Sequence, residues 1–249
     1  MKRSLVFLWL LVLMASTLFA QSNNLTLHLF GSASLPKGDF GKEIGNDAKI
    51  TRRAGFDIGE KVGLANTGFG AGAELISPVW FKGLNWVFST RVFVNAADEA
   101  TVQSKFRSLL GDSVNVEFEF GRWVNVPIMT GFRYDFQLMN EFNVYGILQA
   151  GVNWSKAASR KATLDDLTVE DTGFEFARDF GFEFGLGLII AQRYNIGFRY
   201  LALSSPRYEG TRKLSERMFP EIFKRENAIL GEERTVSMFV VMVGVQLFK

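Results

Sequence analysis

The sequence contains no cysteine, one histidine and only 5 prolines among 249 residues. Without cysteine there can be no disulfides, thiolate metal sites, cysteine nucleophiles or acylation at cysteine. One histidine and scattered carboxylates lack metal-ligand spacing, so we expect no metal site and no cofactor. An excess of one charge sign is also missing, because 28 basic and 26 acidic residues give a net charge of +2. This balance argues against nucleic acid as a partner, since such binding usually needs a large basic field.

The first 20 residues have the parts of a secretory signal peptide. A basic start at Lys2 and Arg3 is followed by an apolar run from Leu5 to Met14, and small residues precede Ala20. The run is shorter than the ~20 apolar residues that an uncleaved helical anchor would need. We therefore expect residues 1–20 to be removed near Ala20, and residues 21–249 to form one exported domain without a transmembrane helix.

Phenylalanine and glycine are abundant, with 25 and 24 residues, and apolar residues recur at alternate positions from residue 25 onward. This period of two is that of a strand with two unlike faces. The clearest case is Phe174 to Ile190, whose even positions are mostly phenylalanine and leucine and whose odd positions are mostly small or charged. From Phe180 to Ile190 such a strand covers roughly 26 Å of depth at a tilt near 40°, which matches the apolar band of a transmembrane barrel. Arg178 lies just beyond this band, where a charge costs little.

Seven further segments have the same alternation, which gives an even number of strands, as a closed transmembrane barrel requires. They are Leu25–Ser34, Thr67–Ser77, Asn85–Ala96, Val124–Phe136, Phe142–Ser155, Tyr194–Leu203 and Thr235–Phe248. Short and long connections alternate strictly along the chain, so we expect short periplasmic turns at one end and long extracellular loops at the other. The fold class predicted is all-β, an eight-stranded antiparallel up-and-down transmembrane barrel. A soluble lipocalin-like barrel or sandwich is the alternative, but it would need polar outward faces.

Three stretches carry a resemblance to a known superfamily: Gly68–Leu75, Val126–Tyr134 and Val243–Phe248. They resemble the eight-stranded outer-membrane β-barrels of OmpA, OmpX and OmpW type and the PorT-like barrels of Bacteroidota. The likeness covers nearly all of residues 21–249 and implies an integral protein of the Gram-negative outer membrane. The partners that it implies are outer-membrane lipids and lipopolysaccharide, the barrel-assembly machinery during insertion, and an extracellular or periplasmic protein.

Pro127 falls inside a predicted strand, although proline cannot donate a ladder hydrogen bond. A closed barrel has no edge at which to place it. We therefore expect a bulge or a local break at Pro127, with residues 113–121 extending above the membrane.

The interior of an eight-stranded barrel is just wide enough for side chains, so we expect a packed lumen without an open channel. When the less apolar face of each strand is taken as the inward one, the sequence predicts a polar network whose members lie at comparable heights in the lumen. Its members are His28, Glu74, Arg91, Arg133, Asp135, Tyr145, Gln149, Glu183 and Arg199. We predict that Glu74 pairs with Arg91 and Glu183 with Arg199, because each pair lies on neighbouring strands joined by a short turn. Arg133 is expected to pair with Asp135 or Tyr145.

Two interpretations of this network remain open. The charges satisfy one another because lipid offers them nothing, or they form a polar binding site or a gated path for a small solute. The structural interpretation is favoured, since buried charges are normally paired.

An enzyme is not expected, and no residue is assigned as catalytic. His28 is the one candidate general base of the usual kind. Outer-membrane lipid A deacylases and palmitoyl transferases resemble this architecture and use a histidine near the outer leaflet, whereas His28 is expected at the periplasmic end. Asp179 and Glu183 share a strand face but lie about 13 Å apart, which is too far for a glycosidase pair.

Two of the long connections carry further signals. In residues 213–225, Pro220 can begin a short helix whose apolar side packs on the barrel rim or on a partner, and the rim is favoured. The acidic connection with Asp165, Asp166, Glu170 and Asp171 could attract divalent cations that bridge lipopolysaccharide, but it lacks calcium-loop spacing.

The leading functional hypothesis is a non-enzymatic outer-membrane barrel with a structural or surface-interaction role and a filled lumen. The alternative is a PorT-like transport or secretion component that docks other proteins. A lipid-modifying enzyme is the third hypothesis, and it would depend on His28.

Overall fold

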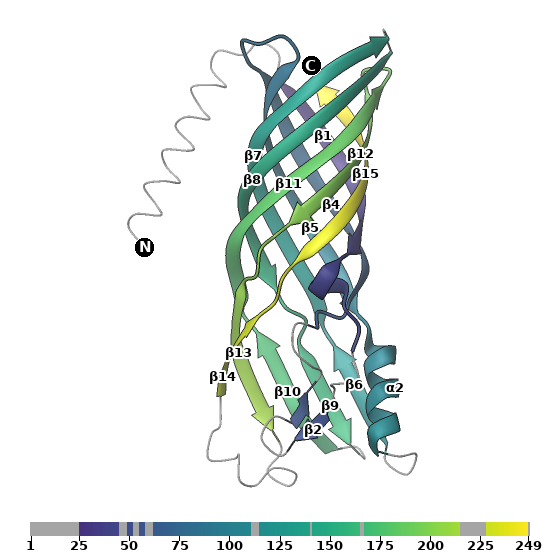
Figure 1. The fold of residues 1–249 in the computed structure, drawn as a ribbon, viewed down its shortest axis with the longest axis vertical. Helices are drawn as coiled ribbons and strands as arrows, with labels where there is room; N and C mark the ends of the chain where they lie inside the picture. The colour runs from purple at the N-terminus through teal and green to yellow at the C-terminus, as the bar shows by residue number, and fades with distance from the viewer. Residues whose placement is uncertain are drawn as a thin grey trace, which may run out of the picture.

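The computed structural model contains a closed antiparallel barrel of eight strands (Figure 1), which confirms the fold class. The structure describes residues 25–44, 49–51, 55–57, 62–110, 115–139, 141–164, 167–214 and 228–248. The barrel strands are β1 (Thr26–Pro36), β4 (Ala65–Pro78), β5 (Leu84–Ala97), β7 (Arg122–Met139), β8 (Phe142–Lys156), β11 (Phe176–Ile190), β12 (Tyr194–Ala202) and β15 (Ser237–Phe248). Each coincides with a segment of predicted alternation, and β15 closes the barrel by pairing with β1. The expected signal peptide lies outside the described residues.

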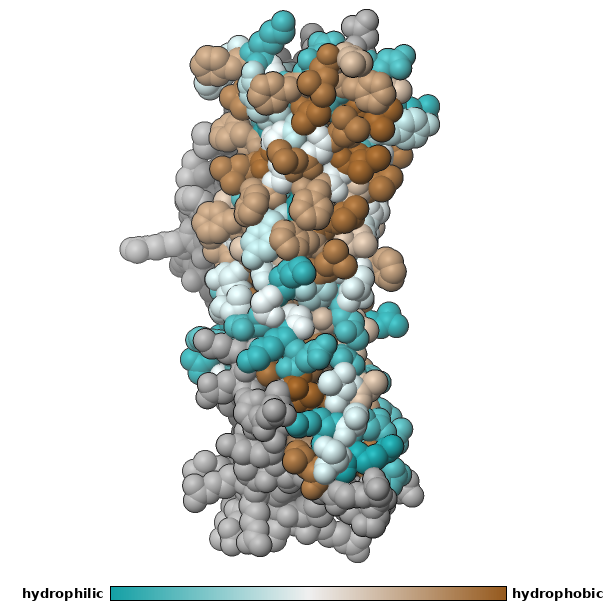
Figure 2. All heavy atoms as spheres, turned by 45° about the vertical axis from the view of Figure 1, so that its right-hand side comes forward, coloured by the Kyte–Doolittle hydropathy of each residue, from teal (hydrophilic) through white to brown (hydrophobic). Residues whose placement is uncertain are grey.

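Apolar side chains point away from the barrel and polar ones point into it. On β11, Phe182 and Phe184 each expose 55% of their surface, whereas Glu183 between them is fully buried. The face in Figure 2 shows hydrophobic side chains gathered over the part of the molecule that holds the short turns, with a hydrophilic band below. Exposed rings around a barrel with buried charges inside require hydrocarbon as the outer solvent. The barrel is therefore the membrane-spanning part of the chain.

The short turns lie at one end of the barrel, and the long connections lie at the other, where they are largely folded (Figure 1). Beyond the barrel a five-stranded sheet has the order β14–β13–β10–β9–β6. Its strands are β6 (Val116–Phe120), β9 (Arg160–Leu164), β10 (Leu167–Phe174), β13 (Arg207–Leu214) and β14 (Ala228–Glu233). The other elements at this end are the 3-10 helix η1 (Gly38–Gly41), the strands β2 (Lys49–Thr51) and β3 (Gly55–Asp57), and the helix α2 (Glu99–Leu110). We call the five-stranded sheet and α2 the cap.

The cap corrects the expectation of long loops, because three of the four long connections contain strands of this sheet. The predicted strand from Phe174 to Ile190 is also divided at Glu175, with β10 in the cap and β11 in the barrel. The helix expected at Pro220 lies outside the described residues. None of the helices in the described part of the chain is both long and apolar enough to cross a membrane.

One apolar core continues from the lumen into the cap. Met129 and Leu201 lie in the barrel, whereas Phe106 of α2 packs on Phe118 of β6 at a ring distance of 5.2 Å. Trp123 joins the two regions, since its indole N–H donates to the carbonyl of Gly63 at 3.0 Å and its ring lies edge-on to Phe40 and Tyr208. The long-loop end of the lumen is thus packed with apolar side chains.

Pro127 produces a local break without a bulge. The ladder between β5 and β7 stops after Thr90–Ile128 and resumes at Phe93–Asn125 in the same register. On its other side β7 pairs with β8 continuously, and Pro127 lies opposite Asn153. Beyond the long-connection end of the barrel, β6 pairs with β9 of the cap. This agrees with the expectation that residues 113–121 extend outside the membrane.

Candidate functional site

Glycine makes room for large polar side chains inside this narrow barrel. Gly72 of β4 lies opposite Arg91 of β5, and a Cβ atom at Gly72 would approach Arg91 Cγ to 2.7 Å and the Phe30 ring to 2.8 Å. Gly187 of β11 lies opposite Tyr145 of β8, where a Cβ atom would overlap the phenol ring. The alternating small residues of these strands therefore provide the volume that the arginine and tyrosine side chains occupy.

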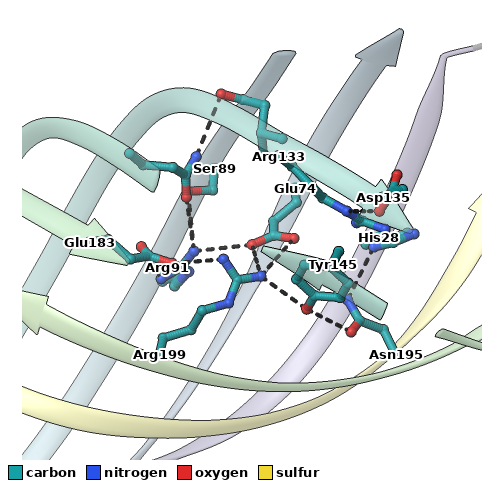
Figure 3. A network of polar contacts seen from close by, with 12 residues as sticks. His28, Glu74, Ser89, Arg91, Arg133, Asp135, Tyr145, Glu183, Asn195 and Arg199 are labelled. Carbon is teal, nitrogen blue, oxygen red and sulfur yellow. Dashed lines mark hydrogen bonds and ion pairs between the residues drawn. The ribbon is translucent and has the colours of Figure 1, made fainter. Parts of the chain in front are cut away.

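Four charged side chains form a closed ring of ion pairs in the lumen (Figure 3). We call Glu74, Arg91, Glu183 and Arg199 the quartet. Arg91 donates to Glu74 Oε1 at 3.1 Å and to Glu183 Oε2 at 2.5 Å. Arg199 donates to Glu74 Oε1 at 3.1 Å and to Glu183 Oε1 at 3.0 Å. All four side chains are at least 99% buried, so each charge depends on the other members for compensation.

The quartet contains two kinds of ion pair. Glu74 and Arg91 lie on the neighbouring strands β4 and β5, and Glu183 and Arg199 lie on the neighbouring strands β11 and β12, as the sequence analysis expected. The other two pairs, Arg91–Glu183 and Arg199–Glu74, cross the lumen, and sequence reasoning missed them. The alternation along each strand carried no signal for these cross-lumen pairs.

A chain of hydrogen bonds leads from the quartet to His28. Arg199 donates to the Tyr145 hydroxyl at 3.2 Å, and that hydroxyl donates to Asn195 Oδ1 at 2.8 Å. Asn195 Nδ2 then lies 3.3 Å from His28 Nδ1, which must accept because an amide nitrogen only donates. His28 Nε2 therefore carries the proton and donates to Gln246 Oε1 at 3.3 Å. Both ring nitrogens are engaged and the side chain is 99% buried, so His28 is held as a neutral imidazole with no free basic nitrogen.

Arg133 contacts both of the partners that were considered for it. Its Nε donates to Asp135 Oδ1 at 2.7 Å, and its guanidinium carbon lies 4.0 Å from the centre of the Tyr145 ring. Asn85 also donates to Asp135, through Nδ2 at 2.7 Å. The carboxylate of Asp135 is thereby held between a cation and an amide.

The predicted network is continuous in the structure. Gln149 accepts from Ser89 at 3.0 Å and from Arg91 at 3.4 Å, which joins it to the quartet. Ser89, Asn195, Gln246 and Asn85 also belong to the network but were not selected from the sequence. All four occupy inward positions, so strand parity was the signal that could have found them. The formal charges of the network balance, since Arg91, Arg133 and Arg199 face Glu74, Asp135 and Glu183.

The network lines a polar cavity of about 310 Å³ at the short-turn end. Its walls include His28, Arg133, Asp135, Asn143 and Gln246. On the side of the quartet that faces the cap, amides and hydroxyls form a second polar layer. In this layer Asn95 donates to Ser34 at 2.9 Å, and Asn153 donates to Asn125 at 3.1 Å. The lumen thus holds polar side chains at more than one level.

A separate charged cluster lies in the cap. Glu170 of β10 is fully buried and accepts from Arg160 Nε at 3.0 Å, from Arg212 Nη2 at 3.0 Å and from the Thr172 hydroxyl at 3.2 Å. Burial alone would raise the pKa of Glu170, but the guanidinium groups of Arg160 and Arg212 outweigh it and hold that pKa below its usual value. The Glu170 carboxylate is therefore engaged by arginines, while Asp165 and Asp166 lie outside the described residues. Among the described residues there is no group of three or more acidic, histidine or cysteine side chains suited to a metal ion.

A closed eight-stranded barrel with an apolar outer surface and a charge-balanced interior defines a transmembrane β-barrel, and this chain has the fold of the eight-stranded outer-membrane class. It is similar to the solved structure of the outer membrane protein OprG from Pseudomonas aeruginosa, with 10% identity over 92% of this chain and 98% of that one, at a TM-score of 0.46. Neisserial surface protein A shares 10% identity over 92% of this chain and 99% of its own, with a TM-score of 0.41. Ail, the attachment invasion locus protein of Yersinia pestis, shares 10% identity over 90% and 97%, with a TM-score of 0.40. No protein-family model and no curated protein matches the sequence. These similarities concern the fold alone.

Proposed function

We propose that this chain is a non-enzymatic integral protein of the outer membrane that holds a folded cap at the cell surface. In this role the barrel is an anchor, and the cap supplies structural or partner contacts. The observation that carries the proposal is the packing of the lumen at two levels. The quartet joins opposite walls of the barrel, and the apolar core around Met129 and Trp123 fills the end toward the cap.

A conductance measurement tests whether the barrel is an anchor or a pore. The purified protein is inserted into a planar lipid bilayer, with a large porin as the positive control for insertion. We expect no stable single-channel steps, because no solute can pass the quartet without breaking several buried ion pairs. Large and stable conductance would contradict the proposal.

Cysteine labelling on intact cells tests which end faces outward. The natural chain has no cysteine, so one introduced thiol reports on one position. Ser104→Cys is exposed on α2 of the cap, and Lys82→Cys is exposed in the β4–β5 turn. A membrane-impermeant maleimide should label Ser104→Cys on intact cells and Lys82→Cys only after the outer membrane is permeabilised. The reverse result would contradict surface display of the cap.

A transport or secretion component is the second candidate. Trp80 and Phe81, in the turn between β4 and β5, expose 85% and 61% of their surface at the short-turn end. They could contact a periplasmic subunit, as the PorT-like interpretation requires. Cross-linking in membranes followed by affinity purification separates the two proposals, since co-isolation of translocon subunits would favour the second one.

The hydrogen bonds of His28 support a non-enzymatic role. Its two ring nitrogens are occupied by Asn195 and Gln246, which leaves it unsuited to accept a proton from a nucleophile. We expect a His28→Ala variant to leave lipid A unchanged when outer-membrane lipids are compared by mass spectrometry. Altered lipid A would favour the enzyme hypothesis.

A further inference from the structure

The outward faces of the eight barrel strands carry only three charged side chains, and all three are cations. They are Arg122 on β7, Lys156 on β8 and Arg178 on β11, which we call the rim cations. The carboxylates of the barrel strands occupy the alternate, inward positions: Glu74, Asp135, Asp179 and Glu183. The membrane-facing surface of these described strands is thus positively charged at one place and uncharged elsewhere.

The strand register brings the rim cations together. β7, β8 and β11 are consecutive in the barrel. Lys156 lies opposite Val124 on one side and opposite Phe176 on the other. Arg122 and Arg178 are each two residues from those partners, so each is a diagonal neighbour of Lys156 at about 7–8 Å. The three cations therefore form one row across three strands.

The row lies at the boundary between the apolar belt and the cap. Trp154 faces outward opposite Arg178, and Phe176 and Phe180 follow on the same face of β11 with 59% and 49% of their surface exposed. Lys156 Nζ lies 5.9 Å from the centre of the Phe176 ring. Aromatic and basic residues side by side are typical of the level of lipid head groups.

No carboxylate of the described residues neutralises the rim cations. None of them forms an ion pair with another described residue. Neighbouring like charges repel each other, and they are stabilised when an anion lies between them. Phosphate fits the chemistry, because arginine binds it through two parallel hydrogen bonds and lysine binds it as a point charge. The row spans about two diagonal steps, which suits a head group with two phosphates better than one with a single phosphate.

We propose that Arg122, Lys156 and Arg178 bind the phosphates of a bisphosphorylated glycolipid of the outer leaflet, whose acyl chains pack over Phe176 and Phe180. This inference rests on the proposed function in one respect, since it requires the cap to face the cell exterior. It adds a specific lipid site on one side of the barrel, and the other five strands lack the charges to form one.

The test measures how firmly the folded protein retains lipid. The protein is placed in phosphatidylcholine nanodiscs that contain a small fraction of lipid A, and the bound lipid is counted by native mass spectrometry. An Arg122→Gln/Arg178→Gln variant is compared with Lys82→Gln/Arg193→Gln, which removes the same charge from exposed positions at the short-turn end. We expect the first variant to bind bisphosphorylated lipid A about thirtyfold more weakly than the natural chain, and the control to change less than twofold.

Three results would overturn the site. They are equal retention of lipid A from which both phosphates have been removed, equal retention of phosphatidylglycerol, and an equal loss in the short-turn control. A comparison of unheated and heated samples on a gel establishes that each variant is folded, since a folded barrel changes its migration when it is heated. Cysteine labelling reports orientation independently, so lost lipid selectivity in a correctly oriented barrel would contradict the lipid site and leave the proposed function standing.

Discussion

Arg91 on β5 and Glu183 on β11 meet across the lumen with Nη1 2.5 Å from Oε2, although β7 and β8 lie between their strands in the barrel. A contact of this kind requires the sheet to curl until β5 and β11 face each other across the lumen. Arg199 and Glu74 make the same kind of contact from the other side. The quartet therefore stabilises the closed barrel as a whole, in addition to the strand pairs from which its members come.

Removing one carboxylate should destabilise the barrel strongly. Glu74→Gln leaves Arg91 and Arg199 buried with only Glu183 as a full counter-charge, and breaking a buried ion pair in this way costs about 3–5 kcal/mol. The free energy of unfolding is measured by urea titration in detergent micelles with the gel shift as readout. Glu119→Gln is the control, because its partner Lys161 is exposed and such a pair contributes about 0–1 kcal/mol. Equal losses in the two variants would contradict the role given to the quartet.

The free-energy cost of an arginine on the outer surface of the barrel should depend on its depth in the bilayer. Phe176 and Phe184 both face outward on β11, but Phe176 lies near the rim cations and Phe184 lies well inside the apolar belt. We expect Phe184→Arg to cost about 2–4 kcal/mol and Phe176→Arg about 0–1 kcal/mol. Reversible folding into lipid vesicles, followed by tryptophan fluorescence over a guanidinium titration, measures both values. Equal costs for the two variants would contradict the placement of Phe184 deep in the apolar belt and of Phe176 near its boundary.

Acid should loosen the cap through Glu170. Its pKa in the folded cap is lower than in the unfolded chain, so its contribution is fully present above about pH 4.3 and is lost as the pH falls through the folded value. Trp123 packs on Tyr208 of the cap and provides a fluorescence signal for this change. Glu170→Gln should remove the pH dependence below pH 5, whereas Glu209→Gln, at an exposed position of β13, should retain it. An unchanged acid response in Glu170→Gln would mean that another carboxylate governs the cap.

Trp123 should hold the cap onto the barrel. In Trp123→Phe the buried carbonyl of Gly63 loses its donor, which costs about 1–3 kcal/mol. We expect faster proteolysis within the cap while the barrel keeps its heat-dependent gel shift. Trp80→Phe is a suitable control, since Trp80 is 85% exposed in a short turn and should have little effect. Loss of the gel shift in Trp123→Phe would show that Trp123 supports the barrel itself.

The barrel strands could be predicted because their pattern is local. The alternation along β11 predicts that Glu183 points into the lumen and Phe184 points outward, without reference to any other strand. The short turns predict which strands are neighbours, and hence the pairs Glu74–Arg91 and Glu183–Arg199. The link between Arg91 and Glu183 depends on the curvature of the closed sheet, which no single strand encodes. Likewise, the roles of Asn195 and Gln246 follow from the position of His28 in three dimensions.

The cap was missed for a related reason. Its strands lie outside the membrane, where both faces can carry mixed residues and the alternation of large apolar and small residues is lost. Glu170 illustrates this, because it lies among acidic residues in the sequence yet is buried between Arg160 and Arg212. The sequence suggested a solvated acidic connection, and only the pairing of β10 with β9 and β13 gives this carboxylate its partners.

The two neighbouring-strand pairs of the quartet have a consequence for how the protein is assembled. β4 with β5, and β11 with β12, are hairpins, and each carries one quartet carboxylate beside one quartet guanidinium. Each hairpin can therefore approach the bilayer with its quartet charges already paired, before the rest of the wall is in place. Closure then adds the contacts across the lumen, so the final step of insertion strengthens a charge balance that the hairpins already possess.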